Sequence, residues 1–266
     1  MALIYGPVPS WRLGRSLGID LLNRKKKVCS FDCVYCQLGR GGELTLEPRE
    51  LVSLERLTSE IKSLGPIKAD YATFSGMGEP TLASNLGEAI ELTRSILHLP
   101  TAVLTNASLM FREDVRKRLA YADTVVAKLD VPNEELFTTI NKPAPGLHFD
   151  QVKDGITLFR DEYRGKLALQ VMFIEANKDY ASDIAALARQ ISADEVQINT
   201  PLRPSRVKPL PREDVASIRE KFNNLRNVVT VYEARKPKVR PLDLAETSRR
   251  RPGLHHNVGS SKAHGG

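Results

Sequence analysis

Segments of strand length alternate with segments of helical periodicity along most of the chain. Between the predicted strands, apolar residues recur at helical spacing, as at Leu54, Leu57 and Ile61. The apolar runs predicted as strands are 17–22, 71–75, 101–105, 124–129, 167–173 and 196–199, and 228–232 is a candidate for a last strand. Such βα units place helices against a mainly parallel sheet with right-handed crossovers. The predicted fold class is therefore α/β.

Periodicity alone leaves open whether this sheet closes into a barrel, closes in part or stays flat and doubly wound. In each case functional groups should gather at the carboxyl ends of the strands. The alternation predicts a core over residues 17–234, preceded by an N-terminal loop segment, 1–16, that is rich in Gly, Pro and Arg. Residues 235–266 are predicted to be a basic C-terminal extension, partly disordered in its Gly-, Ser- and His-containing last stretch, 258–266.

The only three cysteines, Cys29, Cys33 and Cys36, lie within eight residues. An odd number so close together excludes a disulfide framework and indicates a metal or cluster site in a reducing compartment. Thiolates hold iron–sulfur clusters, and three of them on a cubane leave one iron open for a small molecule. A three-cysteine zinc site with a distant fourth ligand and three incidental buried cysteines are the alternatives. The histidines available as a fourth zinc ligand are His98, His148, His255, His256 and His264.

The cysteine segment resembles a known signature. Its Cys-x₃-Cys-x₂-Cys spacing, with Tyr35 directly before the last cysteine, is similar to that of the radical S-adenosylmethionine (SAM) superfamily. A second segment, Ser75-Gly76-Met77-Gly78-Glu79-Pro80, follows a predicted strand and resembles the family's glycine–glutamate–proline loop. The resemblance implies a partial (β/α)6 TIM-like barrel and two cofactors, a 4Fe–4S cluster on the cysteines and SAM.

The resemblance also implies which residues contact SAM. The main chain of Gly76, Met77, Gly78 and Glu79 is expected at its methionine end, together with the Glu79 carboxylate, since glycine lets a backbone approach a ligand closely. Further contacts to SAM or substrate are expected from Tyr35, Asn106, Asp130, Gln170 and Asn199.

The N-terminal stretch 6–20 resembles a group of short radical SAM proteins that are likened to wybutosine-type tRNA-modifying enzymes. Three cysteines allow one cluster only, which disfavours activities that need a second. The resemblance then implies reductive SAM cleavage to a 5′-deoxyadenosyl radical, an oxidoreductase-like reaction, with flavodoxin or ferredoxin as electron donor. An RNA base and a glycine in a glycyl-radical protein partner are the candidate substrates, and a non-catalytic iron–sulfur protein is the rival interpretation.

The charge of the chain indicates what kind of partner it could bind, and its hydropathy indicates where it is located. Lys and Arg number 39 against 32 Asp and Glu, a net charge of +7, which suits an anionic partner as well as ordinary solvated surface. We expect Arg12, Arg15, Arg203 and Arg206 to flank the mouth of the barrel and to dock an anionic macromolecule. No apolar run reaches membrane-spanning length and the N-terminus lacks the features of a signal peptide, so a cytoplasmic location without a membrane partner is expected.

Overall fold

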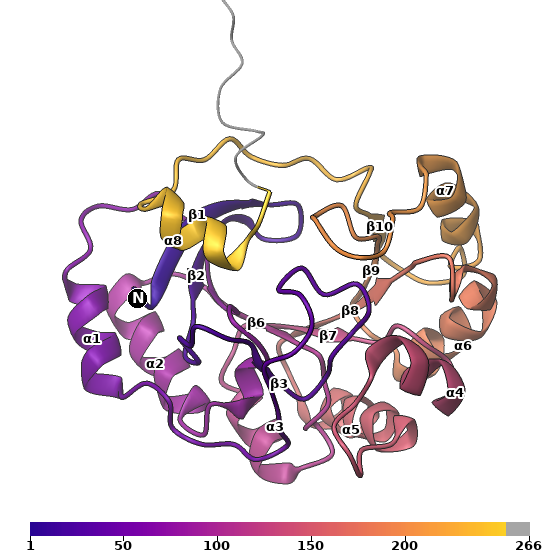
Figure 1. Ribbon diagram of the computed structural model, residues 1–266, viewed down its shortest axis with the longest axis horizontal. Helices are drawn as coiled ribbons and strands as arrows, with labels where there is room; N and C mark the ends of the chain where they lie inside the picture. The colour runs from indigo at the N-terminus through magenta and orange to yellow at the C-terminus, as the bar shows by residue number, and fades with distance from the viewer. Residues whose placement is uncertain (254–266) are drawn as a thin grey trace, which may run out of the picture.

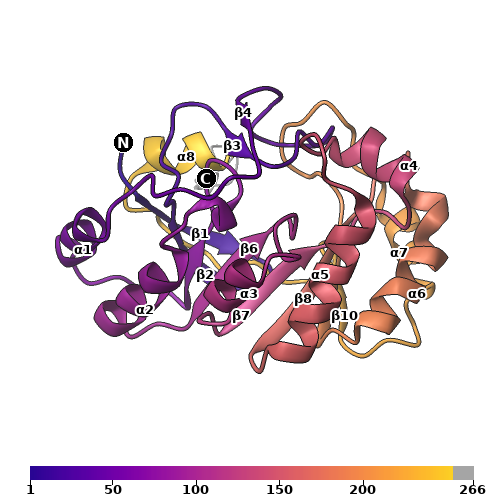
Figure 2. The same ribbon diagram turned by 90° about the horizontal axis from the view of Figure 1, so that it is seen from below.

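The structure is a computed structural model that describes residues 1–253. An eight-stranded sheet curls into an incomplete barrel, with helices on its outer side (Figures 1 and 2). Every neighbouring pair of strands is parallel except β1 with β2. The strands in sheet order are β1 (Ile4–Ser10), β2 (Gly14–Ile19), β5 (Tyr71–Phe74), β6 (Thr101–Thr105), β7 (Thr124–Lys128), β8 (Lys166–Met172), β9 (Glu195–Asn199) and β10 (Val228–Thr230). The predicted α/β fold with a partial, mainly parallel barrel is confirmed.

Helices follow the strands and cover the outer face of the sheet (Figure 2). In α1, Leu57 and Ile61 lie four residues apart and are buried, and the Ser53 side chain accepts a hydrogen bond from the Arg56 N–H, which fixes the start of the helix. The helices are α1 (Leu54–Lys62), η1 (Pro80–Leu82), α2 (Leu86–Leu97), α3 (Glu113–Leu119), α4 (Glu134–Leu136), η2 (Phe137–Asn141), α5 (Phe149–Glu162), η3 (Lys178–Tyr180), α6 (Ala181–Ile191), α7 (Arg212–Glu220) and α8 (Leu244–Arg250). The predicted helix 134–140 is thus a short α-helix followed by a π-helical turn.

The N-terminal segment differs from its predicted loop. Residues 4–10 form β1, which pairs antiparallel with β2 at one edge of the sheet. Gly and Pro within this run argue against a strand, but an edge strand tolerates them, and the pairing shifts register between Tyr5 and Val8, where Gly6-Pro7 falls. The first predicted strand accordingly begins at Gly14 rather than at Leu17.

Part of the C-terminal extension is built into the fold. Asp243 caps α8 by accepting from the Glu246 N–H, and Thr247 Oγ1 accepts from the Gly6 N–H of β1 at 2.9 Å. Arg250 at the end of α8 is fully buried and forms an ion pair of 2.8 Å with Asp20. Residues 235–253 are therefore not a loose tail, and the predicted disorder of 258–266 lies outside the described residues.

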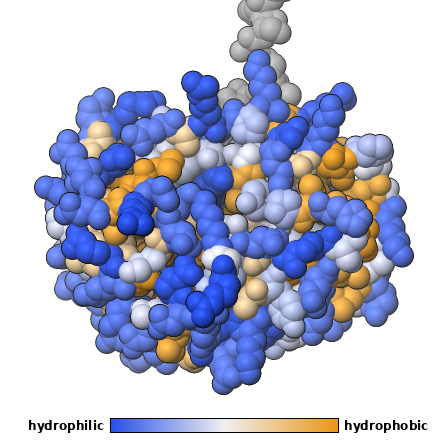
Figure 3. Space-filling model, turned by 180° about the vertical axis from the view of Figure 1, so that it is seen from behind, coloured by the Kyte–Doolittle hydropathy of each residue, from blue (hydrophilic) through white to orange (hydrophobic). Residues whose placement is uncertain are grey.

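The outer surface is mixed in character. Seen from behind, it carries mostly hydrophilic residues with scattered hydrophobic ones (Figure 3). Within residues 1–253, none of the helices combines the length and the apolar character that a membrane crossing requires.

Candidate functional site

The cysteine segment lies across the carboxyl edge of the sheet. It begins with β3 (Val28–Cys29), which pairs with β4 (Glu43–Leu44) in a small separate sheet (Figure 2). On one side the Val28 N–H donates to Met77 O at 2.9 Å and the Glu79 N–H donates to Val28 O at 3.1 Å. These main-chain hydrogen bonds hold the first cysteine directly beside the glycine-rich loop.

The other side of the segment is held by η2. The Asp32 N–H donates to Lys142 O and the Val34 N–H donates to Ile140 O, both at 3.0 Å. The segment that carries the three cysteines is thus fixed between the loop after β5 and the turn after β7. Because both anchors are remote in sequence, their meeting follows from the curled sheet.

The three cysteines form no disulfide, and Cys33 is buried while Cys29 and Cys36 are half-buried. The Asn106 amide donates to Cys29 Sγ at 3.6 Å and the Asn141 amide donates to Cys33 Sγ at 3.8 Å. Within residues 1–253, no three Cys, His, Asp or Glu side chains, the three cysteines included, surround a common metal position. Free thiols with amide donors directed at their sulfurs fit an iron–sulfur cluster, whose potential depends on such hydrogen bonds.

Burial raises the pKa values of two thiols, those of Cys29 and Cys33. Burial, with the charge of Glu79 adding to it, raises the pKa of Cys29 to about 12. Burial raises the pKa of Cys33 to about 11, although the charge of Lys128 opposes the shift. Ligation of iron must therefore displace protons from both thiols.

Two lysines place positive charge beside the cysteines. Lys27 is buried, and its ammonium group forms a hydrogen-bonded ion pair with Asp32. Burial alone would lower the pKa of Lys27, but the hydrogen bond to Asp32 and the charges of Cys36 and Cys29 outweigh burial and raise it. Lys128 lies over the Tyr35 ring, 4.4 Å from its centroid. Both cations suit a site that holds thiolates and an anionic cluster.

The two glycines of the 75–80 loop are required by close packing against the protein itself. Both have positive φ, 157° at Gly76 and 151° at Gly78. A Cβ at Gly78 would lie 1.6 Å from Val28 O, and one at Gly76 would lie 2.3 Å from the Asp20 side chain. Neither glycine carbonyl accepts a hydrogen bond from another described residue, so two acceptors remain open for an ammonium group.

Glu79 does not present its carboxylate to a ligand. The side chain is buried and accepts hydrogen bonds from Thr105 Oγ1 at 2.6 Å, the Asn106 N–H at 2.7 Å and both donors of Thr81. Burial raises the pKa of this carboxyl group, and the hydrogen bonds oppose the rise. Asn106 in turn donates to Ser30 Oγ and Cys29 Sγ, so Glu79 and Asn106 together position the first cysteine.

Tyr35 and Asp130 hold the second half of the cysteine segment. The Tyr35 hydroxyl donates to the buried Asp130 carboxylate, which also accepts from the Asn141 amide at 3.0 Å and pairs with Lys128 at 3.3 Å. The second carboxylate oxygen accepts from the Met172 N–H at 2.8 Å. Burial and the Asp130 charge raise the pKa of Tyr35 well above its usual value, so the phenol stays a neutral donor.

Gln170 and Asn199 lie farther along the same sheet. Gln170 on β8 is buried and in register with Lys128 and Gln197. Asn199 ends β9 and accepts from the Thr200 N–H at 3.0 Å. The structure therefore brings the cysteines together with Gly76–Glu79, Asn106, Asp130 and Tyr35, whereas among the described residues no hydrogen bond joins the Gln170 or Asn199 side chain to them.

Sequence reasoning missed three polar residues of this site. Lys27 belongs to a visible basic run just before Cys29, and Lys128 directly precedes the end of a predicted strand, so both carried a local signal. Asn141 carried none, because its contacts with Cys33 and Asp130 depend on the π-helical turn.

Comparison with known proteins gives consistent results. The family model described as the radical SAM superfamily matches residues 26–188. A UPF0026 protein of Methanocaldococcus jannaschii is 37% identical over 85% of this chain and 72% of its own length. A UPF0026 protein of Synechocystis is 40% identical over 79% of this chain and 78% of its own length. Streptococcus suis SuiB bound to S-adenosylmethionine matches at TM-score 0.58 and 18% identity, and archaeal TYW1 matches at 0.54 and 15%. Each structure matches 79% of this chain, which spans 50% of the SuiB chain and 72% of the TYW1 chain.

The family match covers the cysteine segment, the glycine-rich loop and most of the β/α repeat, and the two relatives extend the likeness over most of the chain. The chain belongs to the radical SAM superfamily and, within it, to the UPF0026 proteins; it is an enzyme of that superfamily, whose cofactors are a 4Fe–4S cluster and S-adenosylmethionine.

Proposed function

We propose that Cys29, Cys33 and Cys36 ligate one 4Fe–4S cluster and that the loop 76–79 holds the methionine end of SAM beside it. The observation that carries the proposal is the pair of main-chain hydrogen bonds that join Val28 to Met77 and Glu79. They place the first cysteine next to the two open carbonyl groups of Gly76 and Gly78, which suit the SAM ammonium.

When bound and reduced, the cluster supplies the electron that cleaves SAM to a 5′-deoxyadenosyl radical, which abstracts hydrogen from the substrate. The chain's own residues bind and orient the reactants and exclude water from the site. Asn106 and Asn141 fix two of the thiols through N–H···S contacts, while Glu79 holds the Asn106 main chain and Asp130 holds the Asn141 side-chain amide. The reaction is oxidoreductase-like, with flavodoxin or ferredoxin as the electron donor.

The remaining predicted contacts lie toward the open side of the barrel. Gln170 on β8 and Asn199 at the end of β9 contact the SAM ribose or the substrate in this proposal. Tyr35 donates a hydrogen bond to Asp130 through its hydroxyl group. It keeps the loop before Cys36 in place rather than binding SAM through that group.

RNA is the first candidate substrate, and the net charge of +7 supports it. A glycine in a protein partner is the second candidate, and it is supported by the single cluster that three cysteines allow. The two are separated by mixing cluster-loaded protein with SAM, reductant and either total RNA or candidate glycyl-radical proteins. The true substrate increases the yield of 5′-deoxyadenosine.

The function itself is tested by anaerobic reconstitution. We expect about four irons per chain, as one cubane requires, and reductive formation of 5′-deoxyadenosine from SAM. Cys33→Ala should abolish SAM cleavage, whereas Lys117→Gln, at an exposed position on α3, should leave it unchanged. An iron-loaded protein that binds SAM without cleaving it would favour the non-catalytic alternative.

A further inference from the structure

Three arginines gather at the open side of the barrel, between the edge strands β1 and β10. Arg12 lies in the turn between β1 and β2, Arg203 in the segment after β9, and Arg251 directly after α8. Figure 1 shows these three parts of the chain around the gap in the curled sheet. All three side chains are at least half-buried.

Two of these arginines attach to the loops of the proposed SAM site. Arg203 Nη1 donates to Gln37 Oε1 at 2.7 Å, and Gln37 follows Cys36 directly. Arg251 Nη2 donates to Ser75 Oγ at 3.1 Å, and Ser75 directly precedes Gly76. The arginines therefore border the site that the cysteine segment and the glycine-rich loop form.

The positive charge of this group is not neutralised by the protein. Among residues 1–253, no carboxylate forms an ion pair with Arg12, Arg203 or Arg251, and residues 254–266 contain no Asp or Glu. Arg12 Nε and Nη1 and Arg251 Nε are shielded from solvent and have no hydrogen-bond partner in this part of the chain. The neighbouring Arg250 differs, since Asp20 and Glu246 both pair with it.

The three guanidinium groups act on one another. Burial lowers the pKa of Arg203 to about 9, with the charges of Arg251 and Arg12 adding to the effect. Burial and the charge of Arg251 lower the pKa of Arg12 to about 10, against the opposing charge of Glu195, which is itself paired with Lys166. At neutral pH all three remain charged, so the folded protein carries an unfavourable cluster of cations that an anion would relieve.

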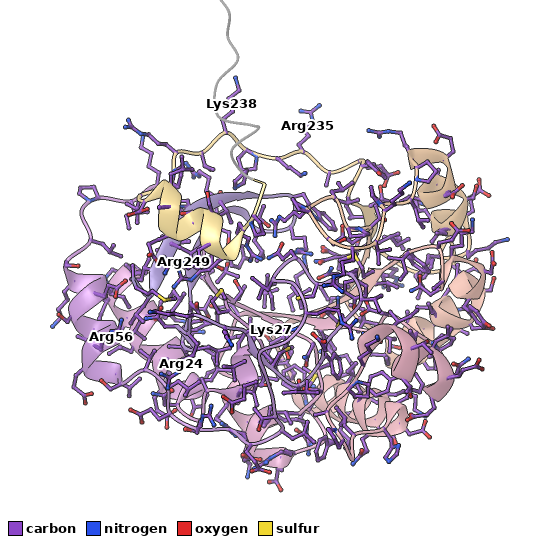
Figure 4. All side chains as sticks on the ribbon, viewed as in Figure 1. Arg24, Lys27, Arg56, Arg235, Lys238 and Arg249 are labelled. Carbon is purple, nitrogen blue, oxygen red and sulfur yellow. The ribbon has the colours of Figure 1, made fainter. Side chains whose placement is uncertain are left out.

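Other basic residues do not share this arrangement. The β1–β2 turn, which carries Arg12, and Arg15 both lie at the amino-terminal edge of the parallel strands, so the predicted place of Arg15 at the mouth is corrected. Arg15 pairs there with Asp70, whereas the charge of Arg12 acts on Arg203. Arg206 is exposed. Arg235 and Lys238 point outward from the segment between β10 and α8 (Figure 4). The shielded donors without partners thus distinguish Arg12 and Arg251 from ordinary solvated charge. Arg203 is half-buried and bonded to Gln37, and it has no carboxylate partner among residues 1–253.

We propose that Arg12, Arg203 and Arg251 bind a phosphate monoester group of the substrate at the open side of the barrel. This inference rests on the proposed function and names the chemistry of its substrate. A phosphate dianion offers several oxygens to forked guanidinium donors and offsets more of the positive charge than a carboxylate does.

The test is phosphate binding by the cluster-reconstituted protein, measured first without and then with SAM. Inorganic phosphate and glycerol 3-phosphate are titrated at constant ionic strength and followed by calorimetry, with acetate as the control anion. We expect saturable binding of one phosphate, weakened at least about tenfold in Arg203→Gln, because a charge-assisted hydrogen bond is lost. Arg206→Gln, three residues along the same segment, should bind as the unmodified protein does.

A second variant protects the test against a folding defect in the first. Arg12→Gln should raise the melting temperature in phosphate-free buffer, because it removes one of three repelling charges, and it should abolish the stabilisation by phosphate. If Arg12 had only a structural role, Arg12→Gln should instead lower the melting temperature in phosphate-free buffer.

Three results would overturn the proposal: equal phosphate binding by Arg203→Gln and Arg206→Gln, displacement of phosphate by SAM, and binding of total RNA without any binding of a phosphate monoester. Displacement by SAM would assign the arginines to the SAM carboxylate. Phosphate binding in a protein that never cleaves SAM would support the phosphate site while refuting the proposed reaction.

Discussion

Gly78→Ala tests how the glycine-rich loop meets the cysteine segment. The new Cβ would lie 1.6 Å from Val28 O, so one of the two backbones must move by roughly 1.4 Å to reach the 3.0 Å contact limit. That shift breaks the hydrogen bonds joining Val28 to Met77 and Glu79, each contributing about 1 kcal/mol. The positive φ adds a conformational cost of order 1–3 kcal/mol for a residue with a Cβ.

The expected loss is therefore about 3–5 kcal/mol of unfolding free energy, or a fall in melting temperature of roughly 6–20 °C for a chain of this size. Thermal unfolding and iron content after reconstitution measure it, and both should fall. Gly146→Ala is the matched control, since Gly146 also has positive φ, 83°, but a Cβ there meets nothing within 4 Å. If Gly78→Ala retains the stability and the iron content of Gly146→Ala, this account of the loop is wrong.

Three further predictions follow from buried groups. The pKa values of Cys29 and Cys33 are raised to about 12 and about 11, so their thiolate fractions in the metal-free protein should rise about tenfold per pH unit up to pH ~10. The rate of alkylation by iodoacetamide, followed by mass spectrometry, should rise with the same slope. A plateau near pH 9 would contradict this prediction. Asp20→Ala leaves the fully buried Arg250 with one carboxylate fewer and should lower the unfolding free energy in urea by about 3 kcal/mol; an unchanged midpoint would refute the role of this pair. Tyr35→Phe removes one donor from a buried carboxylate and should cost about 1–2 kcal/mol in the same assay, with cluster content as the second readout; a more stable variant would argue against the network.

The sequence was informative where local periodicity and spacing decide the structure. The βα alternation predicted the sheet, because apolar runs and helical faces are properties of short windows. The cysteine spacing and the 75–80 loop located the site for the same reason. The hairpin of β1 and β2 was missed, since Gly6, Pro7 and Pro9 read locally as loop residues and only pairing at the sheet edge makes them a strand.

Contacts between distant segments explain what the sequence did not reveal. Asn141 reaches Cys33 across 108 residues, and Arg250 reaches Asp20 across 230. The sequence did not predict that Gly76 and Gly78 pack closely against Asp20 and the Val28 carbonyl. Nor did it predict that the Glu79 carboxylate accepts hydrogen bonds from Thr105 and the Asn106 main chain. In each case the role of the residue is determined by its burial and by its contacts with distant residues. A short stretch of sequence contains neither.

The central claim is that the cysteine segment and the glycine-rich loop form one site in which SAM contacts the cluster. Electron paramagnetic resonance of the anaerobically reconstituted and reduced protein, recorded with and without SAM, tests it most directly. The account predicts the signal of a single reduced 4Fe–4S cluster whose g values change on addition of SAM and do not change in Cys36→Ala. A cluster signal that SAM leaves unaltered, in a protein shown to bind SAM, would contradict the claim.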